Sequence, residues 1–366
     1  MIRSLSVAVV AALSLQGCMF APGQNMDTSR IVRDGTAESS RVELLQITPK
    51  LLAVEAATEK ADEVPAELLT YQPQDYRIGA GDVLYITVWD HPELTTPSGS
   101  QQQSDANGRL VRPDGTLFYP YIGKVRVAGR NIEEVRTEIS SRLAEYVEAP
   151  QVDVAILRFA SQKVVLTGAF AKAGPQPITT TPLSLMEAIG VASVDSTSAD
   201  LSGLQLKRDG REYSLNLDAL NDRQSDLYNL YLKDGDQIHL PYNDRKKVYL
   251  MGEVGNPRAI TYKTRDLNLA DALGSVGGLN QTTASGKAVY VIRGVEDLER
   301  EPAKVFQLDA QSPTAFILAQ RFNLQPQDVV YVGPAGITRW NRFISQLVPS
   351  AGILGTGASI KNDMKN

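Results

Sequence analysis

The chain has 366 residues, a formal net charge of −5 and a hydrophobic fraction of 43%. This length predicts two or three domains, and the composition is that of an ordinary globular protein. The negative charge excludes the broad basic field that nucleic-acid binding uses. The chain has one cysteine, Cys18, which excludes a disulfide within it.

The N-terminus reads "MIRSLSVAVVAALSLQGCMF", in which Arg3 precedes a short apolar stretch at 5–15. This is the pattern of a secretory signal, and it is too short to span a bilayer, which takes ~20 apolar residues. Cys18 stands where cleavage belongs and resembles the acylated cysteine of a bacterial lipobox, although Gln16 departs from the small residue common there. The alternative is an unmodified thiol. We predict a signal peptide at 1–17 and lipidation of Cys18, which leaves no cysteine for catalysis or a metal.

Residues 18–70 are rich in Ala, Thr, Glu and Pro and contain few aromatic residues. This composition predicts an extended leader. A short helix is expected within it, near residues 52–62.

A folded region is expected at 71–160. Residues 83–89 are mainly β-branched or aromatic, which predicts a strand buried on both faces. A turn is expected within 111–127, with strands on both of its flanks. It consists of Pro113, Asp114 and Gly115, in which proline presets φ and glycine adopts a positive φ. Arg112, Pro113, Asp114 and Gly115 together are a candidate site motif.

A helix follows this hairpin, with Asn131 as its N-cap and Glu134 completing a capping box. Its apolar stripe has helical spacing and consists of Ile132, Val135, Ile139, Leu143 and Val147. The segment "PQVDVAILRF" then predicts a returning strand.

The rest of the chain contains an internal repeat. "KVVLTG" at 163 matches "KVYLMG" 84 residues later at 247, and "LSLMEAIG" at 183 matches "LNLADALG" at 267. Each copy, 161–244 and 245–335, is predicted to fold as strand, turn, short helix, strand, strand, turn and strand. The second copy carries a small insertion. The sequence leaves open whether residues near 285–323 form a membrane-proximal gate or only this insertion.

A turn followed by a strand occurs three times, in "GDVLYI", "GDQIHL" and "QDVVYV". A nucleotide-binding loop is excluded, because GxGxxG and GxxxxGK[ST] are absent and each aspartate precedes a strand rather than a helix. We predict that Asp82, Asp236 and Asp328 cap turns.

Catalytic candidates are few. His91 lies beside Asp90 and Glu93, and His239 lies in a predicted strand. No GxSxG elbow accompanies them, and a zinc site would need further ligands that the pattern does not supply. A glycosidase would need two carboxylates, and nothing singles out a pair. We therefore predict structural or surface histidines, no catalytic residue, no metal and no cofactor.

The C-terminal stretch, 336–366, is amphipathic when placed on a helix. About 23 residues at about 1.5 Å each reach ~35 Å, which is enough to cross the hydrocarbon layer. The apolar side holds Trp340, Phe343, Ile344, Leu347, Val348, Ala351, Leu354 and Ala358. The polar side holds Arg339, Asn341, Arg342, Ser345, Gln346 and Ser350, and Ile353 is the exception to this division.

A single helix of this kind cannot stand alone in a bilayer, because its polar face would be unsatisfied. Three arrangements remain open. The helix packs on the protein's own body, lies in the membrane interface, or joins other copies in a closed ring with a polar interior.

Taken together, these features resemble the Wza-like outer-membrane polysaccharide export lipoproteins over essentially the whole chain. The similar segments are the cysteine motif, "YRIGAGDVLYITVWDHPELTTPSG" at 76–99, "VRPDGTLFYPYIGKV" at 111–125, the two repeats and "RWNRFISQLVP" at 339–349. The resemblance implies a multidomain α+β subunit that forms a homo-oligomeric ring, octameric in the type member, and is not an enzyme. An export domain at 71–160, two soluble-ligand-binding β-grasp repeats and a C-terminal amphipathic transmembrane helix at 336–366 are expected.

The resemblance also implies location and partners. The lipid anchor would sit in the outer membrane, with the bulk of the protein in the periplasm and the C-terminus at the cell surface. The cargo would be a capsular or exopolysaccharide, and the partner an inner-membrane polysaccharide copolymerase with tyrosine-kinase activity. The alternatives are a periplasmic polysaccharide-binding scaffold without a pore and a lipid-anchored glycan hydrolase.

In a helical barrel the two faces of the tail would have different roles. The pore side would present Arg339, Arg342, Ser345 and Gln346, and the two arginines would attract acidic sugars. For Arg339 the alternative is contact with lipid phosphates. The membrane side would present Trp340, Phe343, Ile344, Leu347, Val348 and Leu354.

Overall fold

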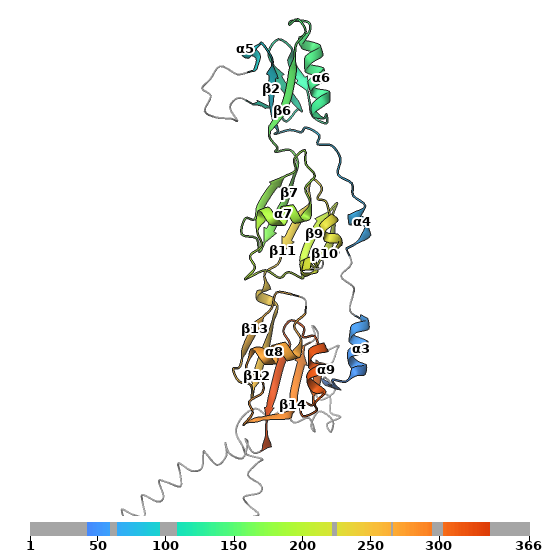
Figure 1. Ribbon diagram of the computed structural model, residues 1–366, viewed down its shortest axis with the longest axis vertical. Helices are drawn as coiled ribbons and strands as arrows, with labels where there is room; N and C mark the ends of the chain where they lie inside the picture. The colour runs from blue at the N-terminus through green and yellow to red at the C-terminus, as the bar shows by residue number, and fades with distance from the viewer. Residues whose placement is uncertain are drawn as a thin grey trace, which may run out of the picture. The chain divides into compact units, whose positions relative to one another are not determined.

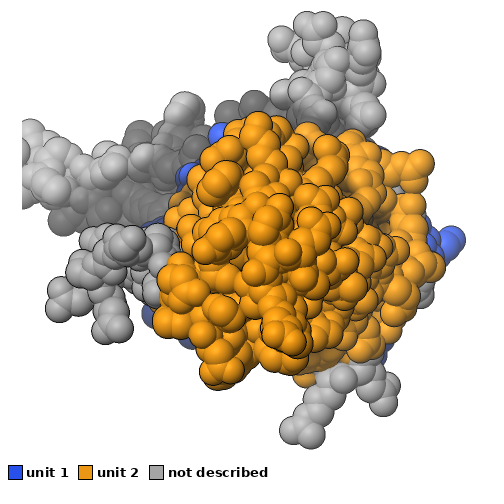
Figure 2. All heavy atoms as spheres, turned by 90° about the horizontal axis from the view of Figure 1, so that it is seen from above, with its two compact units in different colours: residues 1–60, 243–366 blue, residues 61–242 orange. Residues whose placement is uncertain are grey.

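The computed structural model describes residues 42–58, 64–95, 108–221, 225–264, 266–294 and 303–336. The chain divides into two compact units, one made of residues 61–242 and the other of residues 1–60 with 243–366 (Figure 2). No helix in the described ranges is long and apolar enough to cross a membrane. The predicted transmembrane helix lies outside them, from residue 337 onwards.

The export region, residues 71–160, is built from a three-stranded antiparallel sheet, a two-stranded hairpin and one long helix (Figure 1). β2 lies between β3 and β6, and α6 packs beside β6. Leu84, Leu117 and Ile139 join the sheet, the hairpin and the helix in one core. The elements are β2 (Val83–Val88), α5 (Pro92–Thr95), β3 (Arg109–Leu110), β4 (Thr116–Tyr119), β5 (Gly123–Arg126), α6 (Ile132–Leu143) and β6 (Val152–Arg158).

The capping box of α6 is confirmed. The Glu134 N–H donates to Asn131 Oδ1 over 2.8 Å, and the Asn131 N–H donates to Glu134 Oε2 over 3.0 Å. The predicted stripe buries Val135, Ile139 and Leu143. The helix ends at Leu143, so Val147 packs on the core from the following turn.

The strand predicted at 83–89 is confirmed as β2, but the expectation that both faces are buried is wrong. Leu84, Ile86 and Val88 bury one face, whereas Tyr85 and Thr87 on the other face are only partly buried. Trp89 lies past the strand and is 64% exposed. The strand ends there because Asp90 adopts a positive φ of 62°, which turns the chain away from the sheet.

The first repeat is a five-stranded sheet in the order β10-β9-β11-β7-β8, with α7 on the same core (Figure 1). The two central strands, β11 and β7, are parallel, and the other pairs are antiparallel. The elements are β7 (Lys163–Gly168), β8 (Gly174–Pro177), α7 (Leu185–Ala192), β9 (Leu204–Arg208), β10 (Arg211–Leu215), η4 (Leu217–Asn221), η5 (Asp226–Asn229) and β11 (Gln237–Leu240).

The second repeat has the same strand order, β15-β14-β16-β12-β13, which confirms the internal duplication. Here α9 stands where the first repeat has two short 3-10 turns. Its elements are η6 (Asn243–Arg245), β12 (Lys247–Gly252), β13 (Arg258–Thr261), α8 (Leu269–Ser275), β14 (Ala284–Arg293), β15 (Ala303–Leu308), α9 (Ala315–Arg321) and β16 (Val329–Pro334).

Each copy contains one strand more than the sequence predicted. The segment expected to be a turn after the first strand pairs back on it, as β8 on β7 and as β13 on β12. In β8, Pro175 and Pro177 gave the segment the character of a turn. Proline is tolerated in a strand at the edge of a sheet, and β8 is such a strand.

The insertion in the second copy lies in one hairpin. In the first repeat Arg208 pairs with Arg211 across a two-residue turn, Asp209 and Gly210, both with positive φ. In the second repeat Arg293 pairs with Lys304, so the connection between these paired residues runs from 294 to 303. The order of the five strands of the repeat is unchanged.

The leader is not merely extended, because two of its parts fold onto the repeats (Figure 1). β1 (Val42–Gln46) pairs in parallel with β15, and α3 (Pro49–Thr58) places Leu52 in the core of the second repeat. α4 (Ala66–Leu69) places Leu68 in the core of the first repeat. The predicted helix is present but begins at Pro49 rather than near residue 52. β1 was missed because such a short strand is defined only by its partner.

Candidate functional site

The turn predicted at 112–115 is confirmed, but it connects β3 to β4, whereas residues 120–122 join the two strands of the hairpin. The Gly115 N–H donates to the Arg112 carbonyl over 2.9 Å, and Gly115 has a φ of +77°. A side chain there would be strained, and its Cβ would lie 2.7 Å from the Cβ of Ala128. Asp114 accepts from the Thr116 hydroxyl over 2.7 Å and from its N–H over 3.0 Å, and these bonds lower the Asp114 pKa. Arg112 to Gly115 therefore shape this turn, and a role for them in export stays a prediction.

Exposed aromatic side chains gather on the same region. Tyr121 lies at the far tip of the hairpin and Tyr146 in the turn after α6, and their rings stack with centroids 5.9 Å apart. Phe118 and Trp89 are also more than half exposed. Exposed apolar rings are typical of contact surfaces. The sequence analysis did not single out these rings as a site.

The three aspartates of the recurring turn are almost fully buried and cap their turns, as predicted. Each accepts from the backbone N–H three residues earlier. The donors are Gly79 to Asp82 at 2.9 Å, Lys233 to Asp236 at 2.8 Å and Gln325 to Asp328 at 2.8 Å. The residue before each aspartate has a positive φ, at Gly81, Gly235 and Gln327. These carboxylates are therefore structural parts of a shared turn.

In both repeats an arginine from the neighbouring strand neutralises the buried aspartate. Arg208 donates from Nε and Nη2 to Asp236, and Arg293 does the same to Asp328. Each arginine also donates from Nη2 to a backbone carbonyl, that of Tyr231 or Asn323. Burial raises the Asp328 pKa, and the Arg293 guanidinium opposes that shift.

The export region satisfies its aspartate differently. Asp82 accepts from the Tyr76 hydroxyl, the Ser161 hydroxyl and the N–H groups of Ala160 and Ser161, all within 2.9 Å. Burial raises the pKa of Tyr76 well above its ordinary value, so this hydroxyl stays a donor. The turn that holds the aspartate is therefore common to the export region and the repeats, whereas the donors to its carboxylate differ.

The two arginines of the repeats differ in what approaches them from the N-terminal side. Glu55 of α3 lies 3.4 Å from Nη1 of Arg293. The Arg208 guanidinium instead lies 5.2 Å from the ring centroid of Tyr71. Burial raises the pKa of Glu55, and Arg293 partly offsets this. Equivalent arginines of the two repeats are therefore contacted by different chemistry, a carboxylate of the leader in the second repeat and the first residue of the export region in the first.

The histidines have separate partners. Nδ1 of His91 lies 2.9 Å from Oε1 of Glu93 on the surface, and this contact lowers the Glu93 pKa. Nδ1 of His239 lies 3.0 Å from the Thr167 hydroxyl within the first repeat. In the part of the chain that the structure describes, no group of three His, Cys, Asp or Glu residues could hold a metal ion.

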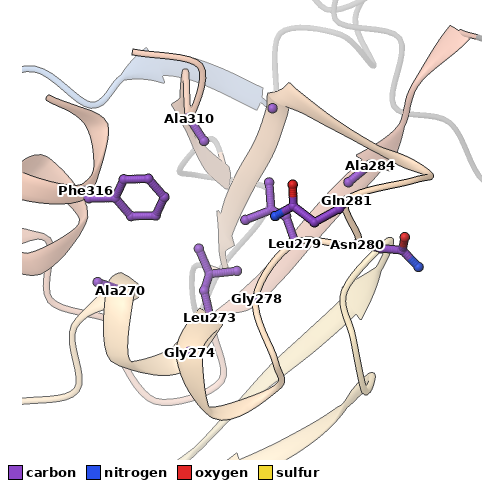
Figure 3. Close-up of a pocket in the computed structure, with 11 residues that line it drawn as sticks. Ala270, Leu273, Gly274, Gly278, Leu279, Asn280, Gln281, Ala284, Ala310 and Phe316 are labelled. Carbon is purple, nitrogen blue, oxygen red and sulfur yellow. The ribbon is translucent and has the colours of Figure 1, made fainter. Parts of the chain in front are cut away.

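A cavity of about 470 Å³ opens in the second repeat between α8 and α9 (Figure 3). Phe316 and Leu273 point into it, and the Gln281 amide lies at its rim. Most of the lining is small or apolar, and it consists of Ala270, Leu273, Gly274, Gly278, Leu279, Asn280, Gln281, Ala284, Gly286, Ala310 and Phe316. Local sequence patterns do not reveal this cavity, because its walls come from two separate segments, 270–286 and 310–316.

The remaining predicted site residues lie outside the described residues. They are the lipidation candidate Cys18, the polar set Arg339, Arg342, Ser345 and Gln346, and the apolar set Trp340, Phe343, Ile344, Leu347, Val348 and Leu354. Their roles stay predictions.

Three family models match the chain in order. A polysaccharide biosynthesis/export protein model matches residues 70–157, an SLBB domain model matches 162–240 and 246–332, and a model of the outer-membrane lipoprotein Wza C-terminal domain matches 335–364. The last match falls on the stretch that the sequence analysis singled out as amphipathic.

Curated relatives match over most of their length. The EPS I polysaccharide export outer membrane protein EpsA of Ralstonia nicotianae is 36% identical over 98% of both chains. The capsule polysaccharide export outer membrane protein CtrA of Neisseria meningitidis is 26% identical over 79% of both chains. The capsule polysaccharide export protein BexD of Haemophilus influenzae is 23% identical over 93% of both chains.

Proposed function

Because this chain belongs to the Wza-like family of outer-membrane polysaccharide export proteins, we propose that it carries a capsular or exopolysaccharide from the periplasm to the cell surface. The observation that carries the proposal is the match to EpsA, which is 36% identical over 98% of both chains. The family's role is transport rather than catalysis.

The proposed assembly is a homo-oligomeric ring, an octamer by family resemblance, anchored in the outer membrane by a lipid on Cys18. The segment 336–366 of each subunit forms one helix in the wall of a helical barrel, with its apolar face toward lipid and its polar face toward water. The amphipathic pattern of the tail and the Wza C-terminal model matching 335–364 support this arrangement. A closed ring satisfies the polar face of every copy. The C-terminus then reaches the cell surface.

The same proposal keeps the predicted division of the chain. The leader at 18–70, the export domain at 71–160 and the repeats at 161–244 and 245–335 form the periplasmic body. The separate cores of the export domain and of the two repeats support this division, and the leader contributes Leu52 and Leu68 to the cores of the repeats. An inner-membrane copolymerase with tyrosine-kinase activity is the proposed partner at the periplasmic base.

In this proposal the channel lets the polymer pass and catalyses no reaction on it. Ser345 and Gln346 offer the polymer many weak contacts, which suits movement because a permeant must not be held tightly. Arg339 and Arg342, repeated around the ring, attract acidic sugars at the periplasmic entrance.

Deletion of residues 338–366 in the native strain tests the pore. The measurement is polysaccharide at the cell surface, with the amount of folded protein in the outer membrane as the control. The pore proposal predicts loss of export with the truncated protein still present. Retained export would support the alternative, a periplasmic polysaccharide-binding scaffold without a pore.

The electrostatic part of the proposal has its own test. Arg342→Glu should reduce export of an acidic polymer while oligomers still assemble, and Arg342→Lys should retain export. Equal export by both variants would show that the positive charge of Arg342 does not contribute to export.

A further inference from the structure

The tip of the export hairpin holds a tyrosine in a conformation that suits glycine. Tyr119 pairs with Gly123, so Tyr121 is the middle residue of a three-residue loop. The Ile122 N–H donates to the Pro120 carbonyl over 2.8 Å, and the φ of Tyr121 is +64°. A three-residue turn with a positive central φ is rare and strained, and a bulky side chain is unusual there. Such strain persists only where the surrounding structure maintains it, and it clusters at functional sites.

Tyr121 is paired with a second tyrosine from another part of the export region. The rings of Tyr121 and Tyr146 stack at an interplanar angle of 29°. The Tyr146 N–H donates to the Leu143 carbonyl at the end of α6, and Val147 packs on the export core. The backbone at both tyrosines is therefore held by the export fold.

The pair is open to solvent on its outer side. Tyr121 is 63% exposed and Tyr146 is 58% exposed. Neither hydroxyl hydrogen-bonds to another of the described residues. Stacking turns one face of each ring toward its partner, so the pair presents the outer faces and edges of the rings, with hydroxyl groups that are free to donate or accept.

A sugar ring complements this surface. One face of a pyranose carries C–H groups that pack on an aromatic ring, and its rim carries hydroxyls that bond to tyrosine hydroxyls. A protein partner is the alternative occupant of two exposed rings, and the binding and export assays given for this platform separate the two.

We propose that Tyr121 and Tyr146 form a stacking platform for a pyranose ring of the exported polysaccharide. This inference rests on the proposed function, because it takes the cargo to be a polysaccharide. The contact is weak and reversible, which lets the polymer move past the export region.

Affinity electrophoresis of the full-length, detergent-extracted protein tests the platform. The gel contains the polysaccharide secreted by the native strain, and retardation across a concentration series gives the affinity. Tyr121→Gly removes one ring while relieving the backbone strain, so circular dichroism should show an intact fold. We expect about a tenfold loss of affinity for Tyr121→Gly and for Tyr146→Ala, the size typical of a lost aromatic contact.

Two further variants separate stacking from other effects. Tyr121→Phe keeps the ring and should lose less than about threefold. Tyr242→Ala removes a tyrosine of the first repeat that is 54% exposed and should bind like wild type. Wild-type affinity in both Tyr121→Gly and Tyr146→Ala would overturn the platform, as would an absence of binding by the wild-type protein.

The proposed export function is tested separately, by measuring export in the strain that carries the 338–366 deletion. If Tyr121→Gly abolishes export in cells while its affinity for the polysaccharide is unchanged, the ring pair serves a protein contact and the platform is wrong. Reduced affinity with reduced export supports the platform and the export function together.

Discussion

The two repeats share one internal arrangement and differ in how the N-terminal part of the chain completes it. Arg208 and Asp236 in the first repeat correspond to Arg293 and Asp328 in the second. In the second repeat the carboxylate of Glu55 approaches the arginine, and in the first an aromatic ring, that of Tyr71, covers it. A duplicated fold therefore kept its buried ion pair while its outer contacts diverged.

The edges of the two sheets diverge in the same way. The second repeat has a sixth strand, β1, on the β15 edge, whereas β10 is the terminal strand of the first sheet. Near that edge of the first repeat, Glu67 of α4 pairs with Arg211. An exposed strand edge invites pairing with other chains, and covering it is a common protection. The leader thus covers one repeat by strand pairing and contacts the other by a side-chain pair.

The largest expected effect comes from removing the buried carboxylates. Asp236→Ala leaves Arg208 buried beside Tyr71 without a counter-charge, and we expect a loss of about 3–5 kcal/mol in the unfolding free energy of the first repeat. Asp328→Ala should cost the second repeat less, because Glu55 remains near Arg293. Calorimetry of the two variants measures both. A larger loss for Asp328→Ala would contradict the role given to Glu55.

An equal effect in both repeats is expected at their paired glycines. Gly168 and Gly252 have φ values of +90° and +84°, and an added Cβ would lie 2.0 Å from the Leu240 carbonyl oxygen and 2.1 Å from that of Val332. Alanine at either position should destabilise its repeat by about 3 kcal/mol, through strain and a backbone clash. Gly210→Ala, where a Cβ meets open space at positive φ, is the matched control for strain alone. Chemical unfolding of the three variants checks this order.

A smaller effect is expected at the helix caps. Ser184 accepts from the Glu187 N–H over 3.2 Å, and the Glu187 carboxylate accepts from the Ser184 N–H over 2.9 Å. Ser184→Ala should cost about 1 kcal/mol in the first repeat. Ser184→Asn should retain most of the stability, since asparagine caps the corresponding helix at Asn268. Thermal unfolding measures the difference. No loss in Ser184→Ala, or a loss of equal size in Ser184→Asn, would contradict the stabilising role given to this side-chain acceptor.

The smallest effect is a dependence on pH that belongs to the second repeat. Burial raises the pKa of Glu55 and of Asp328 in the folded protein. A folded state that binds a proton more tightly than the unfolded state loses stability as pH rises through the raised pKa. Stability should therefore fall as pH rises from the ordinary carboxyl range through the raised pKa values and then level off. Glu55→Gln should reduce this slope, with a change below about 1 kcal/mol because Glu55 is partly exposed. An unchanged slope in the variant would contradict the assignment.

Local patterns allowed much of the fold to be predicted. The capping box at Asn131, the Gly115 turn, the internal repeat and the three turn aspartates all depend on residues close together in sequence. Features that depend on distant partners were missed. β1 exists because β15 offers it an edge, and β8 is a strand despite its prolines because it lies at an edge.

The candidate sites were less predictable for the same reason. The Tyr121–Tyr146 stack joins a hairpin tip to the end of α6, and the cavity in the second repeat joins α8 to α9. A positive φ at Tyr121 has no sequence signal, and the predicted turn lay at 112–115 rather than at 120–122. Composition could show that aromatic residues were present, but not that two of them meet.

The proposed export function requires that copies of this chain form a closed ring. Native mass spectrometry of the mature, full-length protein in mild detergent tests it most directly. We predict a single closed oligomer near eight subunits in which every subunit carries the lipid mass on Cys18. A monomer or dimer would leave the polar face of the C-terminal helix without partners in the membrane. That result would contradict the channel and favour the scaffold.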